Sequence, residues 1–160
     1  QSLLDILILF RLRVHYKWVS KGENFRIPFI GWNMTLNRYI RIERGKLRGN
    51  LQMMRDAEQA LREGNSIMIF PEGTRSADGA VGPFKDGAFE LAQRTGRPIL
   101  PLVVDGTARA LPKRGFVLRG TSAMTIRILP PISVAEIARD GAAATRERVR
   151  QMITEAKGPA

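Results

Sequence analysis

The residues best suited to chemistry form one short string, 70–76 (Phe-Pro-Glu-Gly-Thr-Arg-Ser), at the end of the apolar run 66–70. In open α/β sheets, ligands bind where the chain leaves the end of a buried strand. Gly73 lets the backbone approach a ligand closely, Arg75 offers a two-pronged guanidinium for a phosphate, and Glu72 can hold the loop or a cation. The string therefore indicates a site for a phosphate-bearing ligand. The alternative is a tight surface loop with one Glu–Arg ion pair, which contributes little stability.

An alternation of strands and helices must position this string. Strands separated by helices predict an α/β fold with a mostly parallel central sheet flanked by helices, in a single domain over residues 1–160. Asn50 is expected to cap the third helix, Thr145 to cap the last one, and the strand 66–70 to be covered on both faces. Apolar periodicity predicts helices at 3–14, 28–36, 50–63 and 86–95 and after residue 145, and strands at 16–20, 39–43, 66–70, 98–104 and 124–129.

The composition is that of a globular domain with a strong positive charge. Hydrophobic residues make up 44% of the chain, and 26 Lys and Arg against 15 Asp and Glu give a net charge of +11. Such a surface favours anionic partners, namely nucleic acid, a phospholipid face or a phosphate-bearing small molecule. The absence of cysteine excludes disulfides, a thiolate nucleophile and cysteine-ligated metals within these residues. No run approaches the roughly 20 apolar residues that span a bilayer.

The string 70–76 resembles a block of the glycerophospholipid acyltransferase family, which includes the 1-acylglycerol-3-phosphate acyltransferases. Other segments are similar to that family in order and spacing, and together they cover residues 1 to about 133. The resemblance implies the glycerolipid acyltransferase fold. The further segments are 84–89 (Phe-Lys-Asp-Gly-Ala-Phe), 99–103 (Ile-Leu-Pro-Leu-Val), 17–21 (Lys-Trp-Val-Ser-Lys) and 27–32 (Ile-Pro-Phe-Ile-Gly-Trp).

The resemblance implies an acyltransferase of phospholipid biosynthesis. The fatty acyl group would pass from an acyl thioester, either acyl-CoA or acyl carrier protein, to the free hydroxyl of a lysophospholipid, expected to be 1-acylglycerol-3-phosphate. The thioester is a co-substrate, and no cofactor or metal is implied. The expected partners are the acceptor, the donor and an anionic membrane surface, with no nucleic acid. The expected location is the cytoplasmic face of a membrane, held by an anchor segment outside these 160 residues.

The family's first block has the pattern His-x-x-x-x-Asp, often with a serine inside it, and Ser2 and Asp5 match that pattern. The resemblance places the histidine one position before Gln1, so the sequence is expected to begin directly after its catalytic base and to be inactive as it stands. The histidine would take the proton of the attacking hydroxyl, and Asp5 would orient and stabilise the imidazole. Taken alone, Asp5 is more typical of a capping or exposed helix residue. His15 lies on the wrong side of Asp5 for the pattern and has no assigned role.

The resemblance also implies residues that bind the acceptor and the acyl chain. Arg44 ends a second block in which Arg38 and Arg41 replace the usual Gly and Phe, and this leaves the acceptor head group open. Lys85 precedes a helix N-terminus, which favours anions, and Pro101 lies where an acyl pocket is expected. The alternatives are a solvated basic face for the cations and core packing for Pro101. The expected substrate-binding residues are Arg44, Glu72, Gly73, Thr74, Arg75 and Lys85.

Two other functions stay open on the sequence. A non-catalytic lipid- or anion-binding domain on the same fold would share the charge and the string 70–76. A nucleic-acid-binding module would share the charge, but the sequence has no helix-turn-helix signature, zinc-ligand spacing or aromatic ribonucleoprotein motif. The acyl-transfer interpretation requires Asp5 and the turn 72–75 to meet at one cleft.

Overall fold

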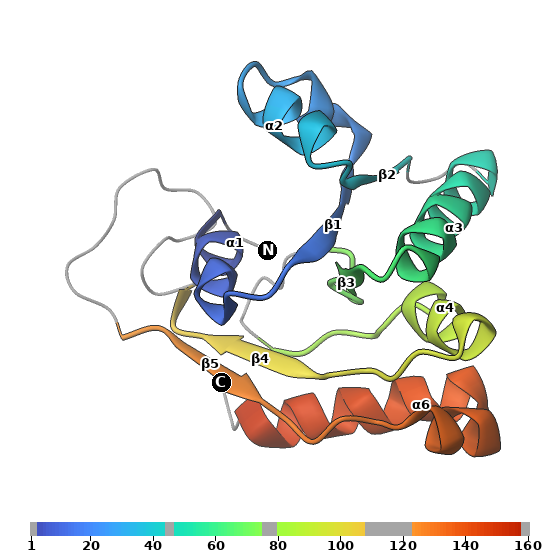
Figure 1. Cartoon of the computed structure of the whole chain (residues 1–160). Coiled ribbons are helices and arrows are strands. Elements are labelled where there is room, and N and C mark those ends of the chain that lie inside the picture. Colours follow the sequence, from blue (N-terminus) through green and yellow to red (C-terminus); the bar gives the residue numbers. More distant parts are fainter. Residues whose placement is uncertain (1–2, 44–46, 75–79, 108–122, 158–160) are drawn as a thin grey trace. The chain divides into compact units, whose positions relative to one another are not determined.

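The computed structural model describes residues 3–43, 47–74, 80–107 and 123–157 (Figure 1). Over these residues the chain forms two compact units. One unit comprises residues 1–13 and 71–160, and the other comprises residues 14–70. The alternating pattern predicts an α/β fold, and this prediction is confirmed. In the unit 14–70, parallel strands separated by helices form a sheet.

The unit 14–70 is built on a three-stranded parallel sheet with the order β2-β1-β3 (Figure 1). Parallel neighbours need a crossover connection, and helices supply both crossovers here. The central strand pairs Val19 with Ile40 on one side and Trp18 with Met68 on the other. The elements are β1 (Tyr16–Lys21), the 3-10 helix η2 (Gly22–Arg26), α2 (Ile30–Leu36), β2 (Ile40–Ile42), α3 (Leu47–Arg62) and β3 (Ser66–Met68).

Aromatic packing fixes one face of β1. Tyr16 and Trp18 are two residues apart, so they share a face of the strand, and both are buried. Their ring centroids lie 5.2 Å apart in an edge-on contact, and Trp18 stacks on Phe70 at 5.7 Å. Burial raises the pKa of the Tyr16 phenol above its ordinary value. The prediction that the strand at 66–70 is covered on both faces is wrong, because Ile67 and Met68 in β3 are only half-buried.

The other unit packs helices against an antiparallel strand pair, β4 and β5, in which Val103 lies opposite Arg127 (Figure 1). A hydrophobic core joins Phe84 and Phe89 to side chains of the last helix, and the two phenyl rings stack at 6.3 Å. The fourth helix ends at Thr95, as the predicted helix 86–95 does, and Gly96 follows it in the left-handed conformation. The elements are α1 (Leu3–Leu9), the 3-10 helix η1 (Phe10–Leu12), α4 (Gly87–Thr95), β4 (Leu102–Asp105), β5 (Thr125–Ile128) and α6 (Val134–Lys157).

The start of α6 differs from the prediction. Thr145 does not cap it, because the helix begins eleven residues earlier at Val134 and Thr145 is buried within it. The cap is Ser133, whose hydroxyl accepts the Glu136 amide while the Glu136 carboxylate accepts the Ser133 amide and hydroxyl. The hydrogen bonds from Ser133, with help from Arg148, lower the pKa of Glu136 to about 2. Gly141 interrupts the helix with a φ of +79° and a ψ of 167°, so two helical segments meet there.

Two further boundaries differ from the prediction. Asn50 does not cap α3, because that helix begins at Leu47 and Asn50 lies in its first turn. The second helix begins at Ile30, two residues after Pro28, because Phe29 adopts a φ of +63° that no α-helix accommodates.

Candidate active site

The turn after residue 70 is tied to the segment that leads into α4. The Lys85 amide donates a hydrogen bond to the Pro71 carbonyl at 3.0 Å. The Gly82 amide donates to the Glu72 carboxylate at 3.3 Å, and Glu72 is half-buried. Glu72 therefore holds the loop, which is one of the two roles that its position in the sequence suggests.

Gly73 and Lys85 lie against each other in this loop. Gly73 has a φ of +69°, a conformation that favours glycine, and a Cβ at this position would lie 3.1 Å from the Lys85 Cε and 3.3 Å from its Nζ. Because Gly73 has no side chain, the side chain of Lys85 can pass directly over the turn. Lys85 and Thr74 are both exposed, so an ammonium and a hydroxyl are available to an anion beside backbone that only glycine fits.

Asp5 is held by a residue that lies 102 positions away along the chain. Its half-buried carboxylate accepts a hydrogen bond from the Thr107 hydroxyl at 2.5 Å. Thr107 is buried and lies two residues after the end of β4. The contact fixes the carboxylate in the first turn of α1, so Asp5 is an anchored group and not a freely rotating surface residue.

Gly106 follows β4 and sets the direction in which the chain continues to Thr107. The Gly106 amide donates to the Asp105 carboxylate at 2.8 Å, and its φ is +85°. A Cβ on Gly106 would overlap the carbonyl oxygen of Ala123. The strand therefore ends in a close backbone crossing, after which Thr107 lies beside Asp5.

Sequence reasoning missed Thr107, although a signal for it exists. The string Asp105-Gly106-Thr107 follows an apolar strand, which is the same arrangement that singled out Glu72 and Gly73. Polar residues with glycine at the end of a strand mark both strings as candidates for a site.

The remaining predicted residues fall into three groups. Arg44 and Arg75 lie outside the described residues. Pro101 is buried directly before β4, and its carbonyl accepts the Leu129 amide. Core packing is therefore observed, and its place in an acyl pocket stays a prediction. Arg41 is exposed in β2, and its guanidinium lies 4.9 Å from the Phe25 ring centroid.

Asp5 and the turn 71–74 belong to the same compact unit, and their meeting at one cleft stays a prediction. A shallow, open depression of about 420 Å³ also lies in this unit, lined partly by basic side chains. Those charges are compensated, because Arg146 pairs with Asp86 at 2.5 Å and Arg150 pairs with Glu147 at 2.6 Å. The depression is therefore a weaker anion site than the Gly73–Lys85 loop. Its lining residues are Val81, Pro83, Phe84, Arg146, Glu147 and Arg150.

Comparison with known proteins shows the family and the fold of the chain. Residues 1–105 match the model of a protein family described as Acyltransferase. A crystal structure titled as the 1-acyl-sn-glycerophosphate acyltransferase PlsC from Thermotoga maritima superposes with a TM-score of 0.83 at 27% identity, over 98% of this chain and 61% of that one.

Curated relatives carry the same description. The chain is 41% identical over 112 residues to the chloroplastic 1-acyl-sn-glycerol-3-phosphate acyltransferase BAT2 of Brassica napus, covering 70% of this chain and 33% of that protein. It is 34% identical over 160 residues to the 1-acyl-sn-glycerol-3-phosphate acyltransferase of Saccharomyces cerevisiae, covering 97% of this chain and 52% of that protein. The chain thus spans about a third to a half of the length of these relatives. By its family match and its identity to them, the chain belongs to the Acyltransferase family.

Proposed function

We propose that the protein transfers a fatty acyl group from an acyl thioester to the free hydroxyl of 1-acylglycerol-3-phosphate, as part of phospholipid biosynthesis. The observation that carries the proposal is the Asp5 carboxylate, which the Thr107 hydroxyl holds at 2.5 Å in the segment that resembles the family's first block. An aspartate held in this way can orient an imidazole and stabilise its protonated form. The printed names of the relatives support the choice of acceptor.

The chemistry needs one base and no acyl-enzyme. We propose that the histidine of the first block takes the proton from the acceptor hydroxyl as its oxygen attacks the thioester carbonyl carbon. The C–S bond then breaks, and the imidazolium returns the proton to the leaving thiolate. Asp5 holds the imidazole throughout and takes no proton.

The Gly73–Lys85 loop is proposed as the part that binds the acceptor phosphate. The Lys85 ammonium passes over a turn with no side chain at Gly73, and the Thr74 hydroxyl is exposed beside it. Arg44 and Arg75 are proposed as further phosphate ligands, and Pro101 as part of the acyl pocket. The donor is proposed to be acyl-CoA or acyl carrier protein, and the net charge of +11 favours either anionic donor and an anionic membrane at the cytoplasmic face.

The test is turnover by the natural gene product. Purified protein is incubated with lysophosphatidic acid and either palmitoyl-CoA or palmitoyl acyl carrier protein, and phosphatidic acid is measured by mass spectrometry. Asp5→Asn is expected to lower kcat by about 10²–10⁴-fold, the usual contribution of a general-base system. Asp56→Asn, at an exposed position on α3, is the matched control and is expected to keep full activity.

A full rate for Asp5→Asn would refute the role of this carboxylate. Binding of lysophosphatidic acid without turnover by either donor would instead favour the non-catalytic lipid-binding domain. Turnover with one donor and not the other would identify the thioester that the enzyme uses.

A further inference from the structure

Helix α2 carries apolar side chains on its packed side and also on its exposed side, where Asn33 and Thr35 are the polar residues. Gly31 and Met34 are buried, and Gly31 approaches η2 so closely that a Cβ on it would overlap the carbonyl oxygen of Phe25. The opposite face carries Trp32 and Leu36, whose exposed fractions are 63% and 82%. The outward face of a helix in a water-soluble domain is normally polar. The outward face of α2 is therefore suited to contact with something other than water.

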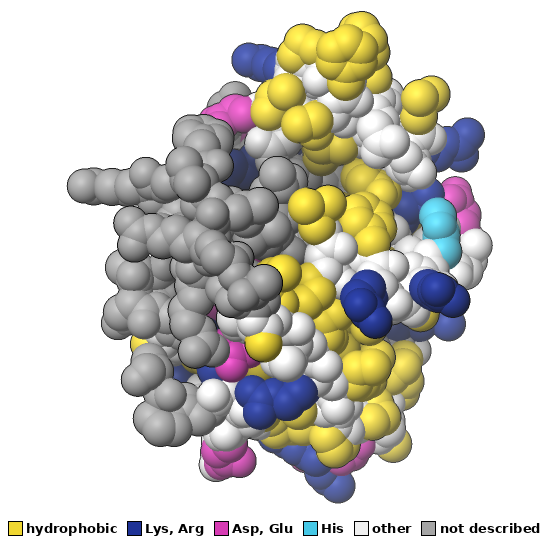
Figure 2. Space-filling model, turned by 90° about the vertical axis from the view of Figure 1, so that its left-hand side faces the viewer, with side chains coloured by type: hydrophobic (Ala, Val, Ile, Leu, Met, Phe, Trp, Pro, Cys, Tyr) yellow, Lys and Arg dark blue, Asp and Glu magenta, His cyan; other side chains and the backbone are white. Residues whose placement is uncertain are grey.

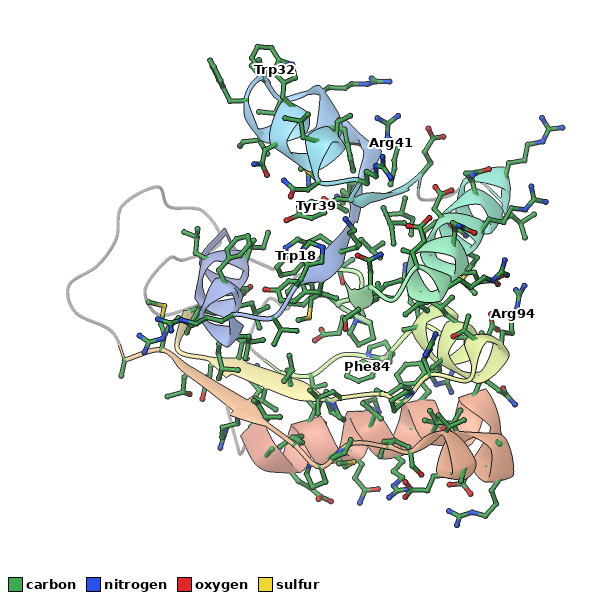
Figure 3. The ribbon with its side chains drawn as sticks, in the orientation of Figure 1. Trp18, Trp32, Tyr39, Arg41, Phe84 and Arg94 are labelled. Carbon is green, nitrogen blue, oxygen red and sulfur yellow. The ribbon has the colours of Figure 1, made fainter. Side chains whose placement is uncertain are left out.

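The apolar character continues into the residues before the helix. Phe29 is 77% exposed, and its ring centroid lies 5.1 Å from that of Trp32 in an edge-on contact. Trp32 and Leu36 are four residues apart in α2 and so share one side of the helix, and the ring contact joins Phe29 to Trp32. Figure 3 shows Trp32 at the outer end of α2, pointing away from β1, and Figure 2 shows hydrophobic side chains gathered at the top, where α2 lies. We call Ile27, Phe29, Ile30, Trp32 and Leu36 the α2 apolar surface.

Basic residues flank the α2 apolar surface in the sequence and on the neighbouring strands. Arg26 lies at the end of η2, Lys21 at the end of β1 and Arg41 in β2, and all are exposed. Arg38, also exposed, follows the helix directly. Residues 21–43 contain these four cations and two carboxylates, those of Glu23 and Glu43, so the segment carries a net positive charge.

We propose that the α2 apolar surface inserts into the boundary between headgroups and acyl chains of an anionic phospholipid membrane. Aromatic side chains with an apolar body favour this interfacial layer, and exposed Lys and Arg beside them are attracted to lipid phosphates. Exposed cations in the elements before and after α2 accompany exposed aromatic residues, and an anionic bilayer is complementary to both features. The inference extends the proposed function, on which it rests for its biological meaning, because the acceptor of that reaction is itself a membrane lipid.

The attachment is interfacial. No helix among the described residues is long and apolar enough to cross a membrane. Trp32 and Leu36 belong to a helix of seven residues, which is about 10 Å long, far less than the roughly 30 Å of a bilayer's hydrocarbon core.

A local probe tests the inference in the natural gene product. The 160 residues contain no cysteine, so within them Leu36→Cys provides a single site for an environment-sensitive dye on the α2 apolar surface. Leu51→Cys is the matched control, because Leu51 is 50% exposed on α3 in the same unit. With vesicles of phosphatidylcholine and phosphatidylglycerol, we expect a blue shift and an intensity gain for the dye at Leu36 and none at Leu51.

Two variants test which side chains contribute to membrane binding. Phe29→Ser and Trp32→Ser are each expected to lower the vesicle partition coefficient that the dye reports by about tenfold. Vesicles of phosphatidylcholine alone are expected to bind roughly tenfold more weakly, because the basic residues lose their partner charges. Thermal denaturation monitors folding, and Trp18, which is buried, serves as a fluorescence reporter of the intact unit.

A dye at Leu36 that does not respond to anionic vesicles would overturn the inference. A response that follows protein concentration without vesicles would also overturn it, because a second copy would then cover the surface. These outcomes are separate from failure of the proposed function, which is measured as absent turnover of short-chain lysophosphatidic acid dissolved below its micelle concentration.

Discussion

Replacement of Thr107 by valine tests whether the anchored carboxylate of Asp5 matters for catalysis. Valine keeps the shape of threonine and removes the hydroxyl that donates to Asp5 at 2.5 Å. A hydrogen bond to a charged acceptor contributes about 1.5–3 kcal/mol, and about 1.36 kcal/mol corresponds to a tenfold change in rate. If the bond acts by holding the imidazole in place in the transition state, kcat should fall about 10- to 100-fold while KM for both substrates changes little.

The assay is steady-state acyl transfer by the natural gene product, with thermal denaturation to monitor folding. Thr107→Ser keeps the hydroxyl and is expected to stay within about threefold of the wild-type kcat. Thr154→Val removes an exposed hydroxyl that bonds only locally, to the Arg150 carbonyl in α6, and is expected to leave kcat unchanged. A Thr107→Val protein with wild-type kcat, alongside an inactive Asp5→Asn protein, would show that the carboxylate needs no support from Thr107.

Three other changes have outcomes that the structure decides. Gly73→Ala should raise KM for lysophosphatidic acid several-fold in initial-rate assays, because the new Cβ displaces the Lys85 side chain from the turn and a φ of +69° costs about 1–2 kcal/mol; an unchanged KM would contradict this. Hydrogen bonds from Ser133 hold the pKa of Glu136 in the folded protein at about 2, so the Glu136 carboxylate stabilises the fold above its ordinary pKa of 4.5 and loses this effect as the pH falls toward 2. Glu136→Gln removes the carboxylate and should therefore flatten the pH dependence of the melting temperature below about pH 4.5. Gly106→Ala should lower the free energy of unfolding by more than about 2 kcal/mol in urea titrations, because a backbone carbonyl occupies the Cβ position, and near-neutral stability would refute that crossing.

Much of the fold could be predicted from local signals. Alternating strands and helices gave the α/β class, and Gly96 marked the end of α4 because glycine adopts the left-handed conformation cheaply. The Glu72-Gly73 turn could be selected from its residue types at the end of a strand, and Lys85 from its place before a helix N-terminus together with the family resemblance. The binding roles of these residues stay predictions.

The features that escaped prediction depend on distant contacts or on backbone geometry. Thr107 lies 102 residues from Asp5, and no periodicity links the two positions. The start of α6 was mistaken because Thr145 is a good cap residue by type, whereas the Ser133–Glu136 capping box satisfies the helix N-terminus earlier. The exposure of Trp32 could not be foreseen, because an apolar residue in a short helix is usually buried.

The break at Gly141 divides α6 into two shorter helical segments. In an unbroken helix, each residue turns the chain by about 100°, so Ile137 and Val149, which are twelve residues apart, would point about 120° apart after about three full turns. Both side chains nevertheless reach the core that holds Phe84 and Phe89. The break at Gly141 therefore lets each helical segment turn its apolar side to the core independently of the other.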